Sequence, residues 1–132
     1  NSHNRAHVCR AVQEGVAFAL VYGITIMKSI GAEVGRVRAG CANMFLSPTF
    51  RDTLAGTLNV PIELYNTDGA QGAARGAGIG AGIFPDVASA FKGLKKEHTV
   101  EPRAQDADAY AAAYGQWSRA LQRGIQTAME NK

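Results

Sequence analysis

Residues 68–82 form a run of glycines and alanines whose spacing could serve nucleotide chemistry. The run reads DGAQGAARGAGIGAG, and Gly76, Gly78 and Ala81 match the fingerprint G-x-G-x-x-G/A. In dinucleotide-binding proteins these glycines let the backbone approach a pyrophosphate at the start of a helix. That chemistry requires the first glycine to follow a strand directly.

The elements around the run argue against phosphate binding by these glycines. A strand is expected at Ile62–Tyr65, and Asp68 is a suitable N-cap for the helix that follows. Gly76 and Gly78 would then lie two turns inside this helix, where backbone N–H groups are bonded to carbonyls. No Lys-Ser or Lys-Thr follows the glycines, so the other phosphate loop is absent from the run. We expect instead that small residues allow close packing on a neighbouring element; they are Gly69, Ala73, Ala77 and Gly80.

A second stretch, Arg38–Met44, places small residues where a strand is expected to end. Val34–Ala39 predicts a strand, Gly40–Asn43 a turn, and Ser47-Pro48 the start of a helix. Open α/β sheets bind ligands at such turns, because backbone N–H groups converge there without obstruction. Asn43 adds a donor and an acceptor, which suit a purine edge. On these residues alone, an ordinary strand-to-helix turn is the preferred interpretation.

The remaining pattern predicts a small sheet covered on both sides by helices, an α/β fold. Apolar residues at three- and four-residue steps predict a long helix from Asn4 to about Ile30, with Asn4 as its N-cap. The last helix, headed by Asp106 or Asp108, carries a stripe expected in the core; it consists of Tyr110, Tyr114, Trp117, Leu121, Gly124 and Ala128. The other expected elements are a helix from Ser47 to about Asn59, a short helix from Asp86 to Leu94 and a brief extended piece at Thr99-Val100.

Length and composition are typical of one soluble globular domain. The chain has 132 residues, of which 46% are hydrophobic and 19% charged. No apolar stretch is expected to reach the roughly 18 residues of a membrane span. The first residue is Asn and no leader pattern follows, so we expect a cytoplasmic piece of a longer chain. The net charge of +3 comes from scattered cations, which favours a solvated surface over a nucleic-acid interface.

The residues that could bind metal or act as a base form no recognisable site. Cys9 and Cys41 lie far apart and are expected to be buried small hydrophobes in a reducing compartment. His3 and His7 have helical metal spacing but no third ligand nearby, so no metal site is expected.

Four ordered blocks resemble the carboxy-terminal part of the sugar kinases of the FGGY family, and among them the xylulokinases most. The blocks are RAHVCRAVQEGVAFAL, AGCANMFLSPTFRDTLAGTLNVPIELY, DGAQGAARGAGIGAG and YAAAYGQW. The resemblance runs from about His7 to Trp117. It implies that residues 1–132 are part of the carboxy-terminal domain of an actin-like, hexokinase-like (ribonuclease H-like) ATPase fold, with the sugar-binding and catalytic domain upstream.

The resemblance also assigns a nucleotide site to the second stretch. The family's adenosine motif corresponds here to Arg38-Ala39-Gly40-Cys41-Ala42-Asn43-Met44. It implies that Ala39 and Gly40 bring backbone against the ribose and phosphates, that Asn43 reaches the adenine edge and that Met44 lies against the ring. Two departures are present: Ala39 stands where glycine is usual, and Arg38 where another glycine is common. Asp68 and Gly69 match a segment interpreted as mainly structural. The first turn of the helix, Asp68 to Gln71, is nevertheless left open to a functional role, because its N–H groups are free.

The resemblance implies transfer of the γ-phosphoryl group of Mg²⁺·ATP to a hydroxyl of a ketopentose, giving the 5-phosphate. The ketopentose that the resemblance favours most is D-xylulose. The resemblance places the aspartate base upstream of Asn1, because Glu14, Glu63 and Asp68 match no base of the family. We therefore expect the chain alone to be inactive. Its expected partners are ATP or ADP and, through the upstream domain, a sugar; neither nucleic acid nor membrane is expected, and homo-oligomer formation is left open. Alternatives are another substrate of the family (glycerol, gluconate, ribulose or rhamnulose) and a non-catalytic α/β interaction domain.

Overall fold

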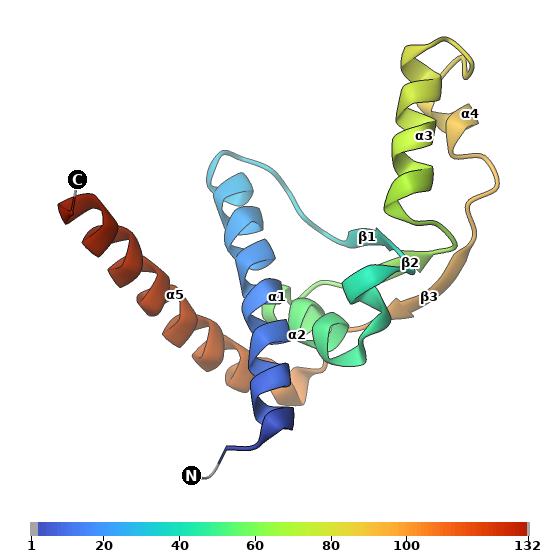
Figure 1. The fold of residues 1–132 in the computed structure, drawn as a ribbon. Coiled ribbons are helices and arrows are strands. Elements are labelled where there is room, and N and C mark those ends of the chain that lie inside the picture. The colour runs from blue at the N-terminus through green and yellow to red at the C-terminus, as the bar shows by residue number, and fades with distance from the viewer. Residues whose placement is uncertain (1–2, 132) are drawn as a thin grey trace.

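A computed structural model describes residues 3–131 as a three-stranded sheet with helices (Figure 1). In chain order the elements are α1 (Arg5–Ser29), β1 (Val37–Gly40), the 3-10 helix η1 (Asn43–Leu46), α2 (Pro48–Leu58), β2 (Ile62–Tyr65), α3 (Gly69–Gly80), α4 (Val87–Ala90), β3 (Lys96–Val100), the 3-10 helix η2 (Ala104–Asp106) and α5 (Ala107–Glu130). The predicted α/β class is confirmed.

Helix α1 begins where the sequence predicts. The Asn4 side chain accepts a hydrogen bond from the backbone N–H of His7 at 3.1 Å, and the Asn4 N–H donates to His7 Nδ1 at 3.3 Å. This reciprocal arrangement is a capping box, so His7 has a structural partner at the helix start. Gly31 follows the helix with a φ of +94°, which glycine adopts without strain.

The sheet has the order β1-β2-β3, with β1 parallel to β2 and β3 antiparallel to β2. The third strand was not predicted beyond Thr99-Val100, since the side chains of Lys96, Glu97 and His98 are polar and exposed. An edge strand of this kind is specified by its pairing with β2 rather than by local hydrophobic alternation. The predicted first strand also begins later than expected, at Val37.

One face of the sheet packs under the hydrophobic core. Ile62 and Leu64 of β2 are completely buried against α1 and α2, which contribute Ala17, Phe50 and Leu54. The opposite face carries Arg38, Glu63 and Tyr65, whose side chains alternate with those that face the core. Helices flank the sheet as expected, but among residues 3–131 only one face lies under a packed core.

Helix α5 packs across α1 and α2 through the first half of the predicted stripe. Tyr114 packs against the core cluster, and the ring of Trp117 lies 6.1 Å from Phe18 and 6.3 Å from Tyr22, measured between centroids. Gly124 and Ala128 are exposed, so the second half of the stripe is not core within the described residues.

Helix α3 projects away from the sheet with α4 beside it (Figure 1). Gly76 and Gly78 lie inside α3, which confirms that they do not form a phosphate loop. Gly78 contacts Phe84: a Cβ there would come within 2.7 Å of the ring. The predicted small-residue stripe is exposed instead of packed; it is Gly69, Ala73, Ala77 and Gly80.

Two expectations about α1 are wrong. Cys9 is exposed on this helix, whereas Cys41 is half-buried. By length and composition alone α1 is also long and apolar enough to cross a membrane, contrary to the expectation of no such stretch. This is weak evidence for a membrane location, because core helices of soluble proteins pass the same test.

Candidate functional site

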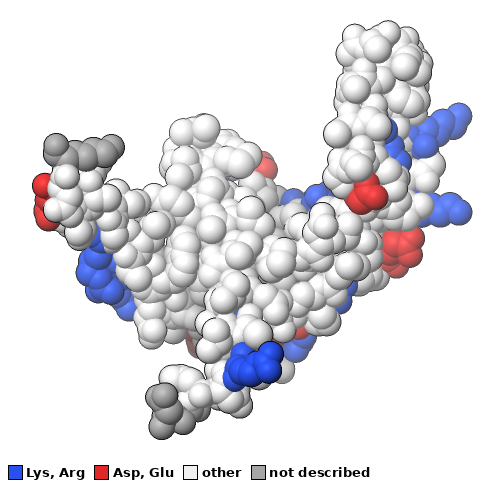
Figure 2. Space-filling view, viewed as in Figure 1, with Lys and Arg blue, Asp and Glu red and all other residues white. Residues whose placement is uncertain are grey.

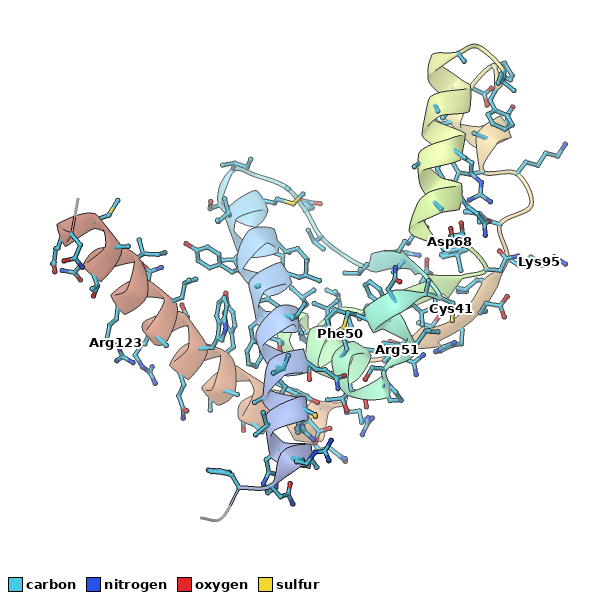
Figure 3. The ribbon with its side chains drawn as sticks, viewed as in Figure 1. Cys41, Phe50, Arg51, Asp68, Lys95 and Arg123 are labelled. Atoms are coloured by element: carbon cyan, nitrogen blue, oxygen red, sulfur yellow. The ribbon has the colours of Figure 1, made fainter. Side chains whose placement is uncertain are left out.

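A hollow of about 470 Å³ lies where β1 ends, between α1, η1 and the start of α3. Figure 3 shows Asp68 at the foot of α3, beside the end of β1 that leads to Cys41. Its lining residues come from α1, β1, η1, α2, the start of α3 and the loops beside them: Val16, Leu20, Arg38, Ala39, Gly40, Ala42, Asn43, Met44, Phe45, Phe50, Asp68 and Gly69. The structure thus joins the predicted turn to the start of the glycine-rich helix.

Gly40 lies where the end of β1 contacts the loop between β2 and α3. A Cβ at this position would overlap the carbonyl group of Thr67, 2.9 Å from its carbon, and would lie 3.3 Å from Asp68 Cα. The next residue, Cys41, donates its backbone N–H to the Tyr65 carbonyl at 2.8 Å. Only glycine therefore permits the end of β1 to approach the loop between β2 and α3 this closely.

Asn43 is exposed and opens η1 with a φ of +51°, in the left-handed region. Asn tolerates this conformation better than most residues with a Cβ. Its amide group makes no hydrogen bond to another of residues 3–131, and Asn43 is one of the residues that line the hollow. Asn43 therefore offers a donor and an acceptor to a ligand.

Four of the five predicted site residues line the hollow. Ala39, Gly40, Asn43 and Met44 do so, and 36% of Met44 is exposed. Cys41 is not among the lining residues and packs against the core cluster, as Ala39 also does. Its thiol serves packing, and only its backbone belongs to the turn.

Asp68 caps α3 and lines the hollow at the same time. Its Oδ1 accepts the backbone N–H of Gln71 at 2.8 Å, which confirms the predicted N-cap. Helix geometry leaves the N–H groups of Gly69 and Ala70 without an intrahelical partner, and the helix dipole gives this end partial positive charge. The sequence left this first turn open to a functional role but did not indicate that Asp68 and Gly69 lie beside Asn43.

Sequence reasoning also missed Val16 and Leu20, which form the α1 wall of the hollow. Both are large exposed apolar residues, with exposed fractions of 43% and 44%. Their spacing indicates that they share one face of a helix, but it does not indicate which part of the protein or which ligand that face contacts. Together with Met44 they provide an apolar surface suited to a planar ring.

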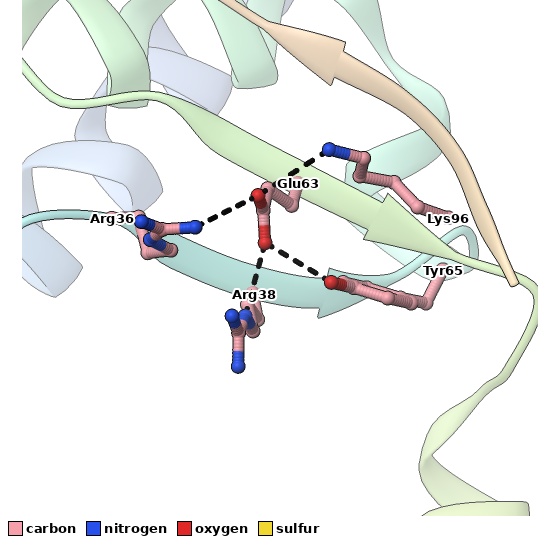
Figure 4. Close-up of polar contacts among 5 residues, drawn as sticks. All are labelled: Arg36, Arg38, Glu63, Tyr65 and Lys96. Carbon is pink, nitrogen blue, oxygen red and sulfur yellow. Dashed lines mark hydrogen bonds and ion pairs between the residues drawn. The ribbon is translucent and has the colours of Figure 1, made fainter. Parts of the chain in front are cut away.

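On the other face of the sheet, the Glu63 carboxylate contacts basic side chains from β1, from β3 and from the loop before β1 (Figure 4). It accepts hydrogen bonds from Arg36 Nη1 at 3.2 Å, Arg38 Nε at 3.0 Å, the Tyr65 hydroxyl at 3.0 Å and Lys96 Nζ at 3.5 Å. These contacts lower the pKa of Glu63 to about 2, and the hydrogen bond from Arg38 contributes most. Partial burial of Glu63 opposes the shift. The same bond raises the pKa of Arg38. This cluster ties β1 to β2 directly before Gly40.

The hollow is equipped to bind rather than to react. Asp68 is the only carboxylate among its lining residues, and its Oδ1 is occupied by the helix cap. A free amide, an apolar wall and unpaired backbone N–H groups suit a heterocycle with an anionic substituent.

Comparisons with known proteins agree on one class of enzyme. No family model matches the chain. The chain is 30% identical over 123 residues to a glycerol kinase of Acaryochloris marina, covering 90% of the chain and 24% of that protein. It is 30% identical over 125 residues to a glycerol kinase of Rhodopirellula baltica, covering 92% of the chain and 23% of that protein.

Solved structures give the same result. A xylulose kinase from Rhodospirillum rubrum superposes with a TM-score of 0.74 at 26% identity, covering 98% of this chain and 26% of that one. A second xylulose kinase, from Brucella ovis, superposes with a TM-score of 0.75 at 29% identity. This match covers 97% of this chain and 26% of the kinase. The chain thus spans about a quarter of the length of the proteins it matches.

Proposed function

We propose, from the premise that this chain is a carboxy-terminal part of an FGGY-family carbohydrate kinase, that residues 1–132 form the adenosine side of its nucleotide cleft. The observation that carries the proposal is the hollow at the end of β1, where Gly40, Asn43 and the start of α3 meet. The enzyme would transfer the γ-phosphoryl group of ATP to a sugar or polyol hydroxyl.

The residues of the hollow have distinct roles in this proposal. Gly40 lets the end of β1 lie against the loop before α3, and the backbone of this turn lies beside the ribose and phosphates. Asn43 hydrogen-bonds the adenine edge, and Met44 packs on the ring. The first N–H groups of α3 favour the negative charge of the phosphates.

In this proposal the hollow accommodates the nucleotide but provides little for its metal ion. Asp68 is the one carboxylate there, so Mg²⁺, which prefers oxygen ligands and phosphates, would be held by the nucleotide and the remaining part of the enzyme. Mg²⁺·ATP supplies the transferable phosphoryl group. The residues of the hollow orient the nucleotide, and they include no carboxylate other than Asp68 to act as a base for the acceptor hydroxyl. We therefore infer that the 132-residue chain alone is inactive.

D-xylulose is the proposed acceptor, and glycerol is the second candidate. The solved neighbours are described as xylulose kinases, whereas the curated relatives are glycerol kinases. The identities are similar and favour neither acceptor, which is consistent with our proposal that residues outside this chain determine it. Phosphorylation of D-xylulose would yield the 5-phosphate in the cytoplasm.

An ADP-release assay on the full-length protein tests the function. We expect release with D-xylulose that exceeds release with glycerol, gluconate, ribulose or rhamnulose, and none from the 132-residue chain. ADP release without dependence on any of these acceptors would contradict a sugar kinase. Highest activity with glycerol would reassign the acceptor and leave the nucleotide side intact.

The role of Asn43 is tested by Asn43→Gly, which removes the amide but keeps the left-handed backbone. We expect a raised KM for ATP with unchanged thermal stability. Asn59→Gly is the matched control, because Asn59 has a φ of +53° at the end of α2 and does not line the hollow. Equal KM values in the two variants would remove Asn43 from the site.

A further inference from the structure

A second hollow, of about 540 Å³, also reaches the end of β1 but extends towards α4 instead of α1. Its volume is typical of small-molecule sites, which span roughly 300–1,000 Å³. Arg38, Ala39 and Gly40 line both this hollow and the candidate nucleotide hollow. The remaining lining residues come from the end of β2, the loop after it, α4 and the segment after α4. The two hollows therefore share only the end of β1.

The wall of this second hollow at α4 is apolar. Val87, Phe91 and Leu94 line it, and 61% of Val87 and 40% of Phe91 are exposed. Figure 2 shows uncharged surface over the lobe formed by α3 and α4, with basic side chains at its outer edge. Exposed apolar side chains gathered in a hollow provide a contact surface for a ring or a hydrocarbon chain.

The wall at β1 is cationic. Arg38 donates its Nε to Glu63 at 3.0 Å, whereas its two terminal nitrogens make no hydrogen bond to another of residues 3–131. The Arg38 side chain is 64% exposed. Arg36 and Lys96 contact the same carboxylate, so three basic side chains share one negative charge (Figure 4). The terminal nitrogens of a guanidinium form a fork that matches a carboxylate or phosphate group, and this wall therefore favours an anion.

Hydrogen bonds hold the two walls together. Arg75 donates its Nη1 to Thr67 Oγ1 at 2.6 Å, and its Cζ lies 5.7 Å from the centre of the Phe91 ring. Asn66 Oδ1 accepts the backbone N–H of Lys95 at 2.7 Å, and the Asn66 N–H donates to the Lys95 carbonyl at 3.0 Å. These contacts fix the segment around α4 to the loop after β2. The hollow is thus formed before a ligand arrives, which lowers the cost of ordering it on binding.

We propose that this hollow is a separate binding site for a small anionic molecule with an apolar ring. Its carboxylate or phosphate group binds the terminal nitrogens of Arg38, and its ring packs on Phe91 and Val87. No acidic residue among 3–131 lines the hollow, so an anion meets no charge repulsion from its walls. Arg38 stands where glycine is common in the FGGY family, so this cation is a feature of this chain and not a requirement of the nucleotide site. The proposed function enters only through the position of the nucleotide.

The compound 1-naphthyl phosphate is a suitable probe, because it joins an aromatic ring to an anion. We expect it to bind the full-length protein in the presence of saturating ADP, which occupies the candidate nucleotide hollow. Inorganic phosphate and 1-naphthol each use one wall, and each should bind at least about tenfold more weakly. Isothermal titration calorimetry measures the three Kd values. Absence of probe binding to the ADP-saturated wild-type protein would overturn the proposal.

Two pairs of variants locate the probe. Arg38→Gln should weaken its binding at least about tenfold, whereas Arg36→Gln should not, because Arg36 contacts the same Glu63 but does not line the hollow. Phe91→Ala should weaken binding, and Ile83→Ala, at a residue that is 74% exposed outside the hollow, should not. Equal Kd values for Arg38→Gln and Arg36→Gln would show attraction by general charge and overturn the proposal. If Phe91→Ala fails to fold, the two arginine variants still decide.

The nucleotide hollow is the other place where the probe could bind. Displacement of the probe by ADP, or loss of its binding in Asn43→Gly, would place it there and overturn the proposal. A full-length protein that binds the probe through Arg38 and Phe91 but phosphorylates no sugar would remove the proposed function and leave this site standing. A sugar kinase that does not bind the probe would lose only this inference.

Discussion

Gly40 and Thr67 touch through their backbones: the space where a Gly40 side chain would stand is filled by the Thr67 carbonyl group. This contact joins the end of β1 to the loop between β2 and α3. It brings Asn43 and Asp68, 25 residues apart in the chain, to one hollow.

Replacement of Gly40 by alanine should therefore separate the two loops. We expect Gly40→Ala to lower the free energy of unfolding by about 1–3 kcal/mol, because backbone must move to admit the methyl group. In the full-length protein it should also raise the KM for ATP. Gly35→Ala is the control, since a Cβ at Gly35 meets nothing within 4 Å. Urea unfolding of both variants measures the difference, and equal midpoints would contradict the contact.

The Glu63 cluster predicts a loss of stability in acid. The pKa of Glu63 is about 2 in the folded protein, below the ordinary value of 4.5. A depressed pKa stabilises the fold above the unfolded-state pKa, and this contribution is lost as pH falls from about 4.5 towards 2. Glu63→Gln should be less stable than wild type at pH 7, and the difference should shrink below pH 4. A difference that does not change with pH would show that Glu63 acts through packing alone.

Two variants of Asp68 distinguish the contribution of its capping hydrogen bond from that of its negative charge. Asp68→Ala should cost about 0.5–2 kcal/mol of stability, because the N–H of Gln71 loses its acceptor. Asp68→Asn should retain most of the stability, since asparagine caps as well. Chemical unfolding of the pair gives the result. If Asn is as destabilising as Ala, the charge rather than the hydrogen bond supports α3.

The packing of α5 on α2 depends on Gly56. A Cβ there would lie 2.6 Å from Tyr110 Cε2, so Gly56→Ala should displace the ring and destabilise the protein by about 1–3 kcal/mol. Gly124→Ala, on α5 and with nothing within 4 Å, should stabilise it by up to about 1 kcal/mol through helix propensity. Thermal unfolding distinguishes the opposite signs. A stabilising Gly56→Ala would show that α5 does not pack here.

The sequence by itself determined the local elements. The caps at Asn4 and Asp68, the proline after Ser47 and the apolar periodicity of α1 act within a few residues, and the structure confirms the helices that they predict. The turn at Gly40–Asn43 and the placement of Gly76 and Gly78 inside a helix also followed from local rules. Even so, Ser47 makes no side-chain cap and instead donates to Gln13.

Only the tertiary structure determines which other elements these helices and strands pack against. The polar strand β3 exists because β2 offers it hydrogen bonds, which no local pattern records. The exposure of Cys9 and of the α3 stripe could not be foreseen, since periodicity gives a helix face but not its partner. The hollow likewise depends on Gly40 meeting Thr67, a contact between segments that are distant in sequence. Side-chain spacing fixes local backbone geometry, whereas sites and surfaces arise from long-range packing.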